Sequence, residues 1–237
     1  MKKIVVGFLS VVLVFLLIGS FAQAGLRFYL DAGYYDPDYG EINEYLSMLS
    51  AGTGMGLGLD SGFFSALGIA GGITPKLEVR LEYGDFTSKT SGSFTDSYEW
   101  EGVTYTSKYR TKMELTVNPL ILSLIYRFSE RALSPYVGVG LGSFSAKLSG
   151  ESWYEEYEDG TLADFSYGQG SYSDDPIGFL VLAGLAKDIG KNFVLRGEVR
   201  YIFSTKATFV DRTASPPWSV DCDLGGFMGS VVLEYSF

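Results

Sequence analysis

The end of the chain, residues 225–237, alternates between apolar side chains and small or polar ones. Phe227, Val231, Leu233, Tyr235 and Phe237 share one side of an extended segment. Because successive side chains of a strand point to opposite faces, this pattern predicts a β-strand with one apolar face. The same alternation predicts seven further strands upstream, near 26–35, 61–73, 76–87, 109–128, 135–147, 177–186 and 192–204.

The predicted connections between these strands alternate in length. Three are short, around Thr74–Pro75, 129–134 and 187–191, whereas four are long, roughly 36–60, 88–108, 148–176 and 205–224. An even number of strands with short turns at one end and long loops at the other is typical of bacterial membrane barrels. This rhythm places both termini at the short-turn end, which is periplasmic in such proteins.

A soluble β-sandwich or a lipocalin-like barrel would show the same alternation, with the apolar face turned inward. Two features favour a membrane barrel, in which the apolar face meets lipid. The apolar faces are long and seldom interrupted, and aromatic residues gather at their ends, as they do at the lipid interface. The predicted fold is all-β: an eight-stranded antiparallel up-and-down transmembrane β-barrel, located in the outer membrane of a Gram-negative envelope.

The N-terminus has the pattern of an export signal. Lys2 and Lys3 precede an apolar run over 4–18, and small residues close on Ala22-Gln23-Ala24. This predicts a signal peptide over 1–24, cleaved after Ala24, followed by a barrel domain over 25–237. A permanent helical anchor is the alternative, but the apolar run is shorter than the roughly 20 residues that a span needs.

Composition excludes several classes of site. The chain has no histidine, so the usual general base near neutral pH is missing, and no paired-carboxylate motif stands out. We therefore expect a protein that is not an enzyme and that holds no cofactor. The single cysteine, Cys222, rules out an internal disulfide framework. We expect it in a surface loop, with a small buried residue as the alternative.

The strand faces opposite the apolar ones carry charge, and we expect them to line the lumen. A bulge expected at Asn118-Pro119 moves the apolar side of the fourth strand from odd to even positions. The predicted luminal network contains six basic and six acidic residues: Arg27, Asp31, Glu78, Arg80, Glu82, Lys112, Glu114, Arg127, Arg196, Glu198, Arg200 and Glu234. Buried charges need partners, and an eight-stranded barrel is only wide enough for side chains. We therefore expect a plugged lumen.

The long connections are strongly acidic. By the ranges above they sum to about −15, whereas removal of residues 1–24 changes the net charge from −10 to −12. The connection over 148–176 carries most of these carboxylates, interleaved with tyrosines. Glu155, Glu156, Glu158 and Asp159 form a weak Ca²⁺ candidate, because Ca²⁺ takes oxygen ligands. A basic partner surface is the alternative ligand of these carboxylates and tyrosines. Hydrated, mobile loops without a bound ion are the favoured interpretation, so no metal site is predicted.

Two glycine-rich stretches, GTGMGLGLDSG (52–62) and GVGLG (138–142), superficially resemble phosphate-binding loops. A dinucleotide-binding loop requires a helix after a strand, and no helical pattern follows either stretch. We interpret both as strands with small inward residues, so the second strand could begin as early as Met55.

The segments PYVGVGLGSF (135–144), FVLRGEVRYIF (193–203) and VVLEYSF (231–237) resemble the small outer-membrane β-barrel family. That family includes the membrane domain of OmpA-type proteins and the OmpX-like and opacity-like proteins. The resemblance implies that the barrel assembly machinery recognises the last strand through Tyr235 and Phe237. It also implies a charged internal network, which here matches Arg80, Glu82, Arg196, Glu198 and Arg200.

These observations lead to a functional expectation. The leading hypothesis is a surface protein that displays acidic, Tyr-rich extracellular loops for adhesion or envelope interaction. The alternative is a narrow porin-like passage for small or apolar solutes, and an enzyme acting on envelope lipid is a third and weaker hypothesis. Expected partners are outer-membrane lipid and lipopolysaccharide, the barrel assembly machinery and an extracellular ligand, with no nucleic acid.

Overall fold

The computed structural model describes residues 25–129, 133–213 and 216–236. The predicted signal peptide over 1–24 and the terminal Phe237 lie outside the described residues. Among the described residues, no helix has the length and apolarity needed to cross a bilayer. The described part of the chain is dominated by antiparallel strands.

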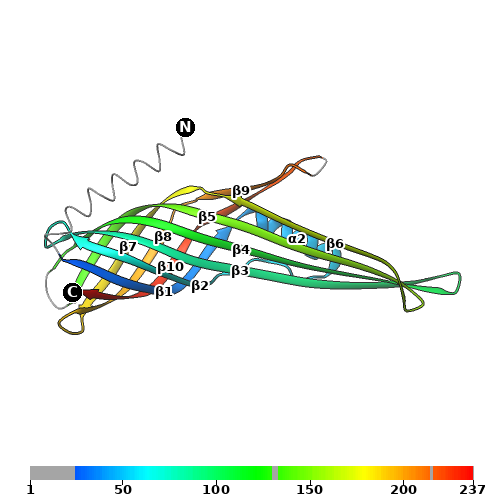
Figure 1. Cartoon of the computed structure of the whole chain (residues 1–237), viewed down its shortest axis with the longest axis horizontal. Coiled ribbons are helices and arrows are strands. Elements are labelled where there is room, and N and C mark those ends of the chain that lie inside the picture. The colour runs from blue at the N-terminus through cyan, green and yellow to red at the C-terminus, as the bar shows by residue number, and fades with distance from the viewer. Residues whose placement is uncertain (1–24, 130–132, 214–215, 237) are drawn as a thin grey trace.

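Eight strands close into a ring, which confirms the predicted barrel (Figure 1). Each strand pairs antiparallel with the next, and the pairing of Phe28 with Tyr235 joins the first strand to the last. The barrel strands are β1 (Leu26–Tyr39), β2 (Gly62–Gly72), β3 (Leu77–Trp100), β4 (Val103–Arg127), β5 (Leu133–Glu158), β7 (Ile177–Asp188), β8 (Phe193–Ile202) and β10 (Trp218–Ser236).

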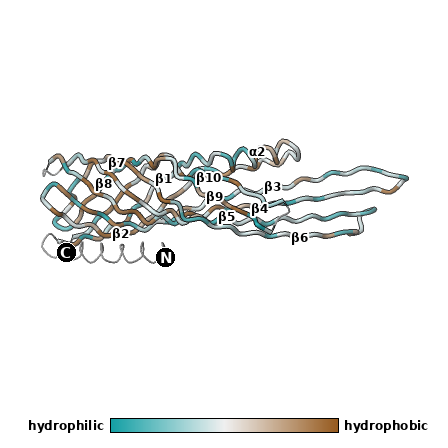
Figure 2. The backbone as a smooth tube through the Cα atoms, turned by 90° about the horizontal axis from the view of Figure 1, so that it is seen from above, coloured by the Kyte–Doolittle hydropathy of each residue, from teal (hydrophilic) through white to brown (hydrophobic). Residues whose placement is uncertain are grey.

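An apolar belt surrounds the barrel, and β8 shows its alternation most clearly. Phe193, Leu195, Val199, Tyr201 and Phe203 are exposed, whereas the residues between them on β8 at even positions are buried. The belt on this strand covers 193–203, which matches the 9–11 tilted residues that cross a bilayer. Figure 2 shows the resulting alternation of brown and teal along the barrel strands. The apolar side therefore faces lipid and the charged side faces inward.

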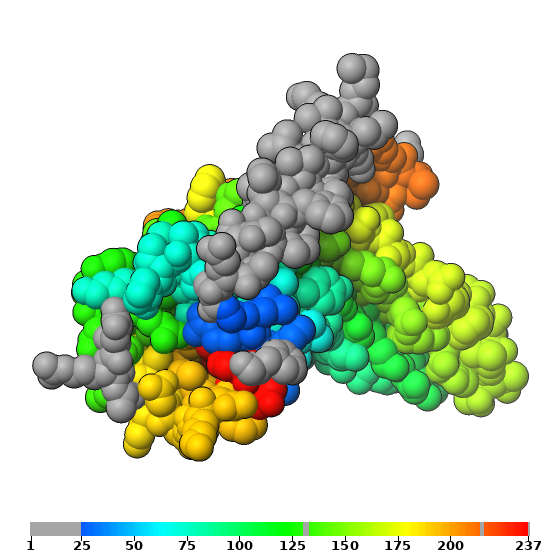
Figure 3. All heavy atoms as spheres, turned by 60° about the vertical axis from the view of Figure 1, so that its left-hand side comes forward, coloured from blue at the N-terminus to red at the C-terminus, as the bar shows by residue number. Residues whose placement is uncertain are grey.

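Three barrel strands continue far beyond the belt, and a fourth strand joins them there. β3, β4 and β5 have 24, 25 and 26 residues, and β6 (Thr161–Asp174) pairs with the distal half of β5. Figure 1 shows these strands running out on the side opposite the C-terminus, and Figure 3 shows the yellow-green β5–β6 hairpin projecting past the barrel. We call the part of the sheet formed by 88–116 and 147–174 the extracellular sheet, after the side of the membrane on which the sequence predicts it.

The extracellular sheet corrects the prediction of loops over 88–108 and 148–176. Both segments form hairpins that close on two-residue turns, Glu101-Gly102 and Asp159-Gly160, with positive φ at all four residues. Such turns match the twist of the flanking strands. These segments alternate between two largely polar faces, so they lack the apolar face on which the strand prediction depended. A shorter hairpin joins β9 (Lys206–Asp211) to β10.

The first long connection contains a helix, α2 (Glu41–Thr53), followed by an extended segment over 54–61. This corrects both the predicted loop over 36–60 and the early start of the second strand at Met55. The expectation of small inward residues was also wrong here, because Met55, Leu57 and Leu59 point inward and the glycines between them face outward. Side chains supply the hydrogen bonds that a neighbouring strand would otherwise provide. The Leu59 N–H donates to Asn43 Oδ1 at 2.8 Å, and Asn43 Nδ2 donates to the Leu59 carbonyl at 3.0 Å.

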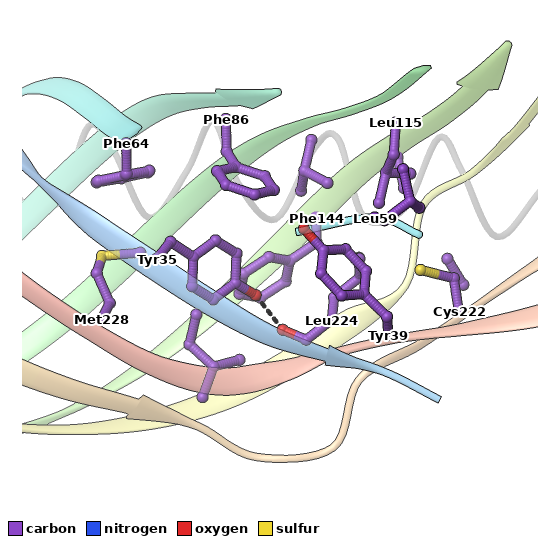
Figure 4. Close-up of a cluster of buried hydrophobic side chains, with 14 of the residues drawn as sticks. Tyr35, Tyr39, Leu59, Phe64, Phe86, Leu115, Phe144, Cys222, Leu224 and Met228 are labelled. Carbon is purple, nitrogen blue, oxygen red and sulfur yellow. Dashed lines mark hydrogen bonds between the residues drawn. The ribbon is translucent and has the colours of Figure 1, made fainter. Parts of the chain in front are cut away.

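Apolar side chains fill the half of the barrel interior nearer the extracellular sheet (Figure 4). We call this cluster the apolar plug. Phe64, Phe86 and Phe144 are fully buried members of it, and the centroids of the Tyr35 and Phe86 rings lie 5.0 Å apart in an edge-on contact. The Tyr35 hydroxyl donates a hydrogen bond to the Leu224 carbonyl. α2 and the segment over 54–61 add buried residues on the distal side of the plug.

Two further expectations were wrong. The register between β4 and β5 is constant through Asn118 and Pro119, so no bulge is present there. Odd residues of β4 stay inside from Leu115 onward, and it is the barrel interior that changes from charged to apolar. Cys222 does not lie in a surface loop: it is fully buried in β10 opposite Ala207 of β9.

Candidate functional site

Ten of the twelve predicted luminal residues point into the barrel. They comprise five arginines and five carboxylates, so their formal charges cancel. All are buried except Arg27 and Arg127, which are partly exposed at the end of the barrel with the short turns. The ten residues are Arg27, Asp31, Glu78, Arg80, Glu82, Arg127, Arg196, Glu198, Arg200 and Glu234.

Glu78 is the centre of the cluster nearer the short turns. Its carboxylate accepts hydrogen bonds from Arg27 at 2.8 Å, Arg127 at 2.9 Å and Arg196 at 3.0 Å, and from Arg80 Nε at 2.8 Å. These donors come from β1, β4 and β8 and from β3 itself, so one carboxylate joins four strands of the ring. Charge-assisted bonds of this kind are stronger than neutral ones.

Two other residues extend this cluster and join it to the next. Glu234 of β10 accepts hydrogen bonds from Arg27 at 2.5 Å and from Arg196. Arg80 contacts Glu78 through Nε and Glu198 through Nη1, in the latter case at 2.8 Å. The two carboxylates therefore share one guanidinium, and the network is continuous along the barrel axis.

Arg200 is the centre of the second cluster, closer to the apolar plug. It donates to Asp31 on β1, Glu82 on β3 and Glu198 on β8, and the bond from Nη2 to Glu82 measures 2.9 Å. A buried charge is costly unless it is paired and hydrogen-bonded. Each guanidinium here contacts at least one carboxylate, although Arg196 Nε and Nη1 and Arg80 Nη2 are buried without a hydrogen-bond partner among the described residues. The network links the strands across the lumen.

Two tyrosines belong to the network in addition to the predicted charged residues. Tyr29 lies opposite Gly68, which lies opposite Glu82, and its hydroxyl donates to Glu82 at 3.2 Å. Tyr136 repeats the arrangement across Gly184 to Glu198, at 2.8 Å. The guanidinium of Arg80 lies 5.4 and 5.5 Å from the two ring centroids, within cation–π range. A tyrosine in phase with inward charges and facing a glycine is the signal that identifies them.

Lys112 and Glu114 are the two exceptions, and the prediction for them was wrong. Both lie on the outer surface of the extracellular sheet, where Glu114 forms an exposed salt bridge with Lys89 at 2.8 Å. The error follows from the bulge assumed at Asn118-Pro119. Without that bulge, even residues of β4 face outward along its whole length.

The weak Ca²⁺ candidate lies at the tip of the β5–β6 hairpin. Glu155 and Glu156 point to opposite faces of β5, where they accept hydrogen bonds from Tyr157 and Tyr154, each at 3.0 Å. Asp159 lies in the turn and accepts a hydrogen bond from the Thr104 amide at 2.9 Å. Among the described residues no three acidic or thiol side chains gather closely enough to hold a metal ion.

The outer face of the extracellular sheet combines cations with aromatic rings. Lys108 lies 4.5 Å from the centroid of Tyr157, and Lys112 lies 5.2 Å from that of Trp153. The Trp153 ring in turn contacts Tyr167 on β6 at 5.5 Å. This face therefore provides its own partners for its positive charges.

Comparison with known proteins supports the fold. No protein-family model matches the sequence, and no curated protein matches it. Among solved structures, the outer membrane protein OprG from Pseudomonas aeruginosa matches with a TM-score of 0.52 and 18% identity, covering 90% of this chain and 96% of that chain. Neisserial surface protein A matches with a TM-score of 0.48 and 15% identity, covering 90% and 98%. At 18% identity the likeness to OprG shows the fold alone, which agrees with the outward apolar belt.

Proposed function

We propose that this chain, which has the fold of the small outer-membrane β-barrels, is a non-enzymatic surface protein that presents its extracellular sheet for adhesion or envelope interaction. In this proposal the barrel is a closed support. The extracellular sheet and its flanking elements carry the binding function.

The packing of the lumen supports a closed support rather than a passage. Along the barrel axis the described side chains form two layers, the charged network and then the apolar plug. Interiors packed in this way leave few voids larger than a water molecule. The alternative of a narrow passage for small or apolar solutes requires an opening through both layers.

The observation that carries the proposal is the exposure of large aromatic residues far beyond the belt. Tyr98, Trp100, Phe165 and Tyr167 lie on the extracellular sheet with 45% or more of their surface exposed. Tyrosine and tryptophan are enriched at protein interfaces, because a rigid ring supplies contact area at a low entropic cost. Residues exposed to water at this distance from lipid serve neither the core nor the membrane.

Orientation and assembly complete the proposal. The end of the barrel with the short turns, where Arg27 pairs with Ser236, faces the periplasm, as in other bacterial barrels. The terminal strand, with Tyr235 packed on Phe193 at 5.1 Å, is the segment presented to the barrel assembly machinery together with Phe237. Lipopolysaccharide surrounds the base of the extracellular sheet.

A variant with shortened hairpins tests the function. Replacing 93–110 by Asn-Gly joins Gly92 to Thr111, and replacing 152–168 by Asn-Gly joins Glu151 to Gln169; both are cross-strand pairs. We expect cells that produce this variant to lose attachment to polymer-coated and protein-coated surfaces that retain cells with the full chain. Heat-modifiable migration on gels checks that the barrel still folds. Equal attachment by both strains, at equal surface abundance, contradicts the proposal.

A further inference from the structure

The inner face of the extracellular sheet, which continues the lumen side of β3–β5, carries a row of carboxylates. Asp96 lies opposite Ser107, Ser107 lies opposite Glu156, and Glu156 lies opposite Asp164. Directly opposed residues of antiparallel strands share a face. Three carboxylates and one serine therefore form a single row across four strands, which we call the carboxylate row.

Aromatic rings border the carboxylate row on both sides. Toward the barrel, Phe94, Tyr109 and Tyr154 form the neighbouring row on the same face. Toward the tip, Tyr98 and Tyr105 stack at 5.2 Å with nearly parallel rings. Tyr98 is 53% exposed and Tyr109 is 36% exposed, so these two rings are open to solvent, whereas Phe94 packs against the apolar plug. From the carboxylate row to the tip no other described element covers this face, and it combines aromatic surface with negative charge.

The two faces of the sheet differ completely in their positive charge. The outer face carries all the lysines and arginines of the described extracellular sheet, namely Lys89, Lys108, Arg110, Lys112 and Lys147. No described lysine or arginine forms a salt bridge with a member of the carboxylate row. Glu156 accepts a hydrogen bond from Tyr154 at 3.0 Å, while Asp96 and Asp164 accept from the backbone of the next residue. The negative charge of the inner face is therefore uncompensated within the described chain.

The placement of Glu156 opposite Asp164 is unfavourable without a counter-charge. Like charges directly opposite each other destabilise a strand pair, and both carboxylates lie on the same face. The pKa of the Tyr105 phenol is raised, first by partial desolvation and then by the negative charges of neighbouring carboxylates, among them Glu158 and Asp159. A cation placed on this face would relieve the repulsion and lie within reach of aromatic rings.

The spacing of the row indicates the kind of cation. Neighbouring strands lie about 4.8 Å apart, so the row extends over about 14 Å from β3 to β6. Such a spread exceeds the coordination sphere of one metal ion, in which oxygen ligands lie about 2.3–2.6 Å from Ca²⁺. It suits several cationic side chains that are carried on one extended segment.

We propose that the inner face of the extracellular sheet binds a lysine- or arginine-bearing segment of an extracellular polypeptide. The cationic groups pair with the carboxylate row, and their aliphatic stems and guanidinium planes lie on Tyr98, Tyr105 and Tyr109. This inference rests on the proposed function, since it names the partner of the same surface.

The experiment uses the full mature chain in lipid nanodiscs and a fluorescent peptide of alternating arginine and serine. We expect saturable binding that weakens as NaCl rises from about 0.05 to about 0.5 M, because exposed ion pairs are screened. A triple variant, Asp96→Asn, Glu156→Gln and Asp164→Asn, should bind about tenfold more weakly, since three exposed pairs are lost together. A peptide of alternating glutamate and serine should not bind.

The matched control removes three carboxylates from the outer face: Glu99→Gln, Glu151→Gln and Glu155→Gln. It changes the net charge equally and should alter affinity by less than the inner-face variant. Equal weakening by both triple variants, or no binding of the basic peptide, overturns the inference. Saturation of the inner face by a second copy of the chain, detected by cross-linking at Tyr98→Cys, overturns it too. If the shortened hairpins still abolish attachment in any of these cases, the proposed function survives and only its partner is wrong.

Discussion

The hydroxyl of Tyr136 donates a 2.8 Å hydrogen bond to Glu198, two strands away. The bond is possible because Gly184 occupies the position between them and leaves room for the ring. Tyr29, Gly68 and Glu82 repeat this arrangement on another side of the barrel. Two tyrosines therefore join strands across the lumen, each reaching past a glycine to a glutamate, in addition to the ion pairs.

Gly184→Ala should destabilise the barrel. A Cβ at this position would lie 2.5 Å from the Tyr136 ring and 2.5 Å from the Gly197 carbonyl oxygen, closer than atoms can approach. Overpacking of this kind costs about 1–3 kcal/mol, and displacement of Tyr136 would also break its bond to Glu198. Urea unfolding in lipid vesicles measures the loss. Gly197→Ala is the control, because a Cβ there meets nothing within 4 Å; equal losses would show that the Tyr136 contact is unimportant.

Arg196→Met should cost more than any exposed ion pair. Arg196 is fully buried and contacts Glu78 and Glu234, so its loss leaves two buried carboxylates with fewer partners. Removing one partner of a buried pair costs about 3–5 kcal/mol. Lys89→Met, which removes the exposed bridge to Glu114, should cost less than about 1 kcal/mol. The same unfolding assay compares them, and a smaller effect at Arg196 would argue against a structural role for the network.

Phe144→Ala tests the apolar plug. Phe144 is 1% exposed inside the barrel, and its removal leaves a cavity that costs about 3–5 kcal/mol. Phe179→Ala removes the same atoms from the lipid-facing side, where Phe179 is 64% exposed, and bilayer lipid can fill the space. We expect the midpoint of urea unfolding to fall further for Phe144→Ala. The reverse order would mean that the outer half of the lumen is loosely packed.

Cys222 should be inert to thiol reagents in the folded protein. Burial, followed by the charge of Asp223, raises the pKa of the thiol to about 12. The thiolate is the reactive form, so labelling should stay far slower than that of a free cysteine with a pKa of about 8.5 at every pH from about 7 to about 9. Maleimide labelling followed by mass spectrometry measures this. Ser219→Cys in a Cys222→Ser background places an exposed thiol nearby and should label at once.

The period-two alternation predicted the barrel because lipid enforces it. Residues such as Phe193, Leu195 and Val199 must meet hydrocarbon, while Arg196 and Glu198 between them must be sealed inside. Both requirements act on consecutive residues of one strand. The inward position of ten luminal charges could therefore be inferred from the alternation of apolar and polar residues along each strand.

Beyond the belt that constraint disappears, and the prediction of loops was wrong there. Both faces of the extracellular sheet are polar or aromatic, so hydrophobic periodicity carries no signal. The turn dipeptide Asp159-Gly160 did carry one, since Asp-Gly between alternating segments is a strong hairpin signal. The register Glu158 to Thr161 across this turn follows from it.

The composition of the lumen could be predicted only in part. The alternation shows which residues point inward, but the change from a charged to an apolar interior near Ile121 and Leu180 produces the same sequence pattern as a bulge. In the sequence, an apolar residue that points into the lumen looks the same as an apolar residue that faces lipid after a bulge. The long-range contacts of Phe64, Phe86 and Phe144 decide between the two.

Single-channel recording in planar bilayers tests the central claim, that the barrel is a closed support, most directly. We expect the purified mature protein to insert and to give no current above the baseline, because the charged network and the apolar plug both fill the lumen. The shortened-hairpin variant should be equally silent, since both layers remain. A stable and reproducible unitary conductance from the unmodified protein would contradict the account and favour the passage instead.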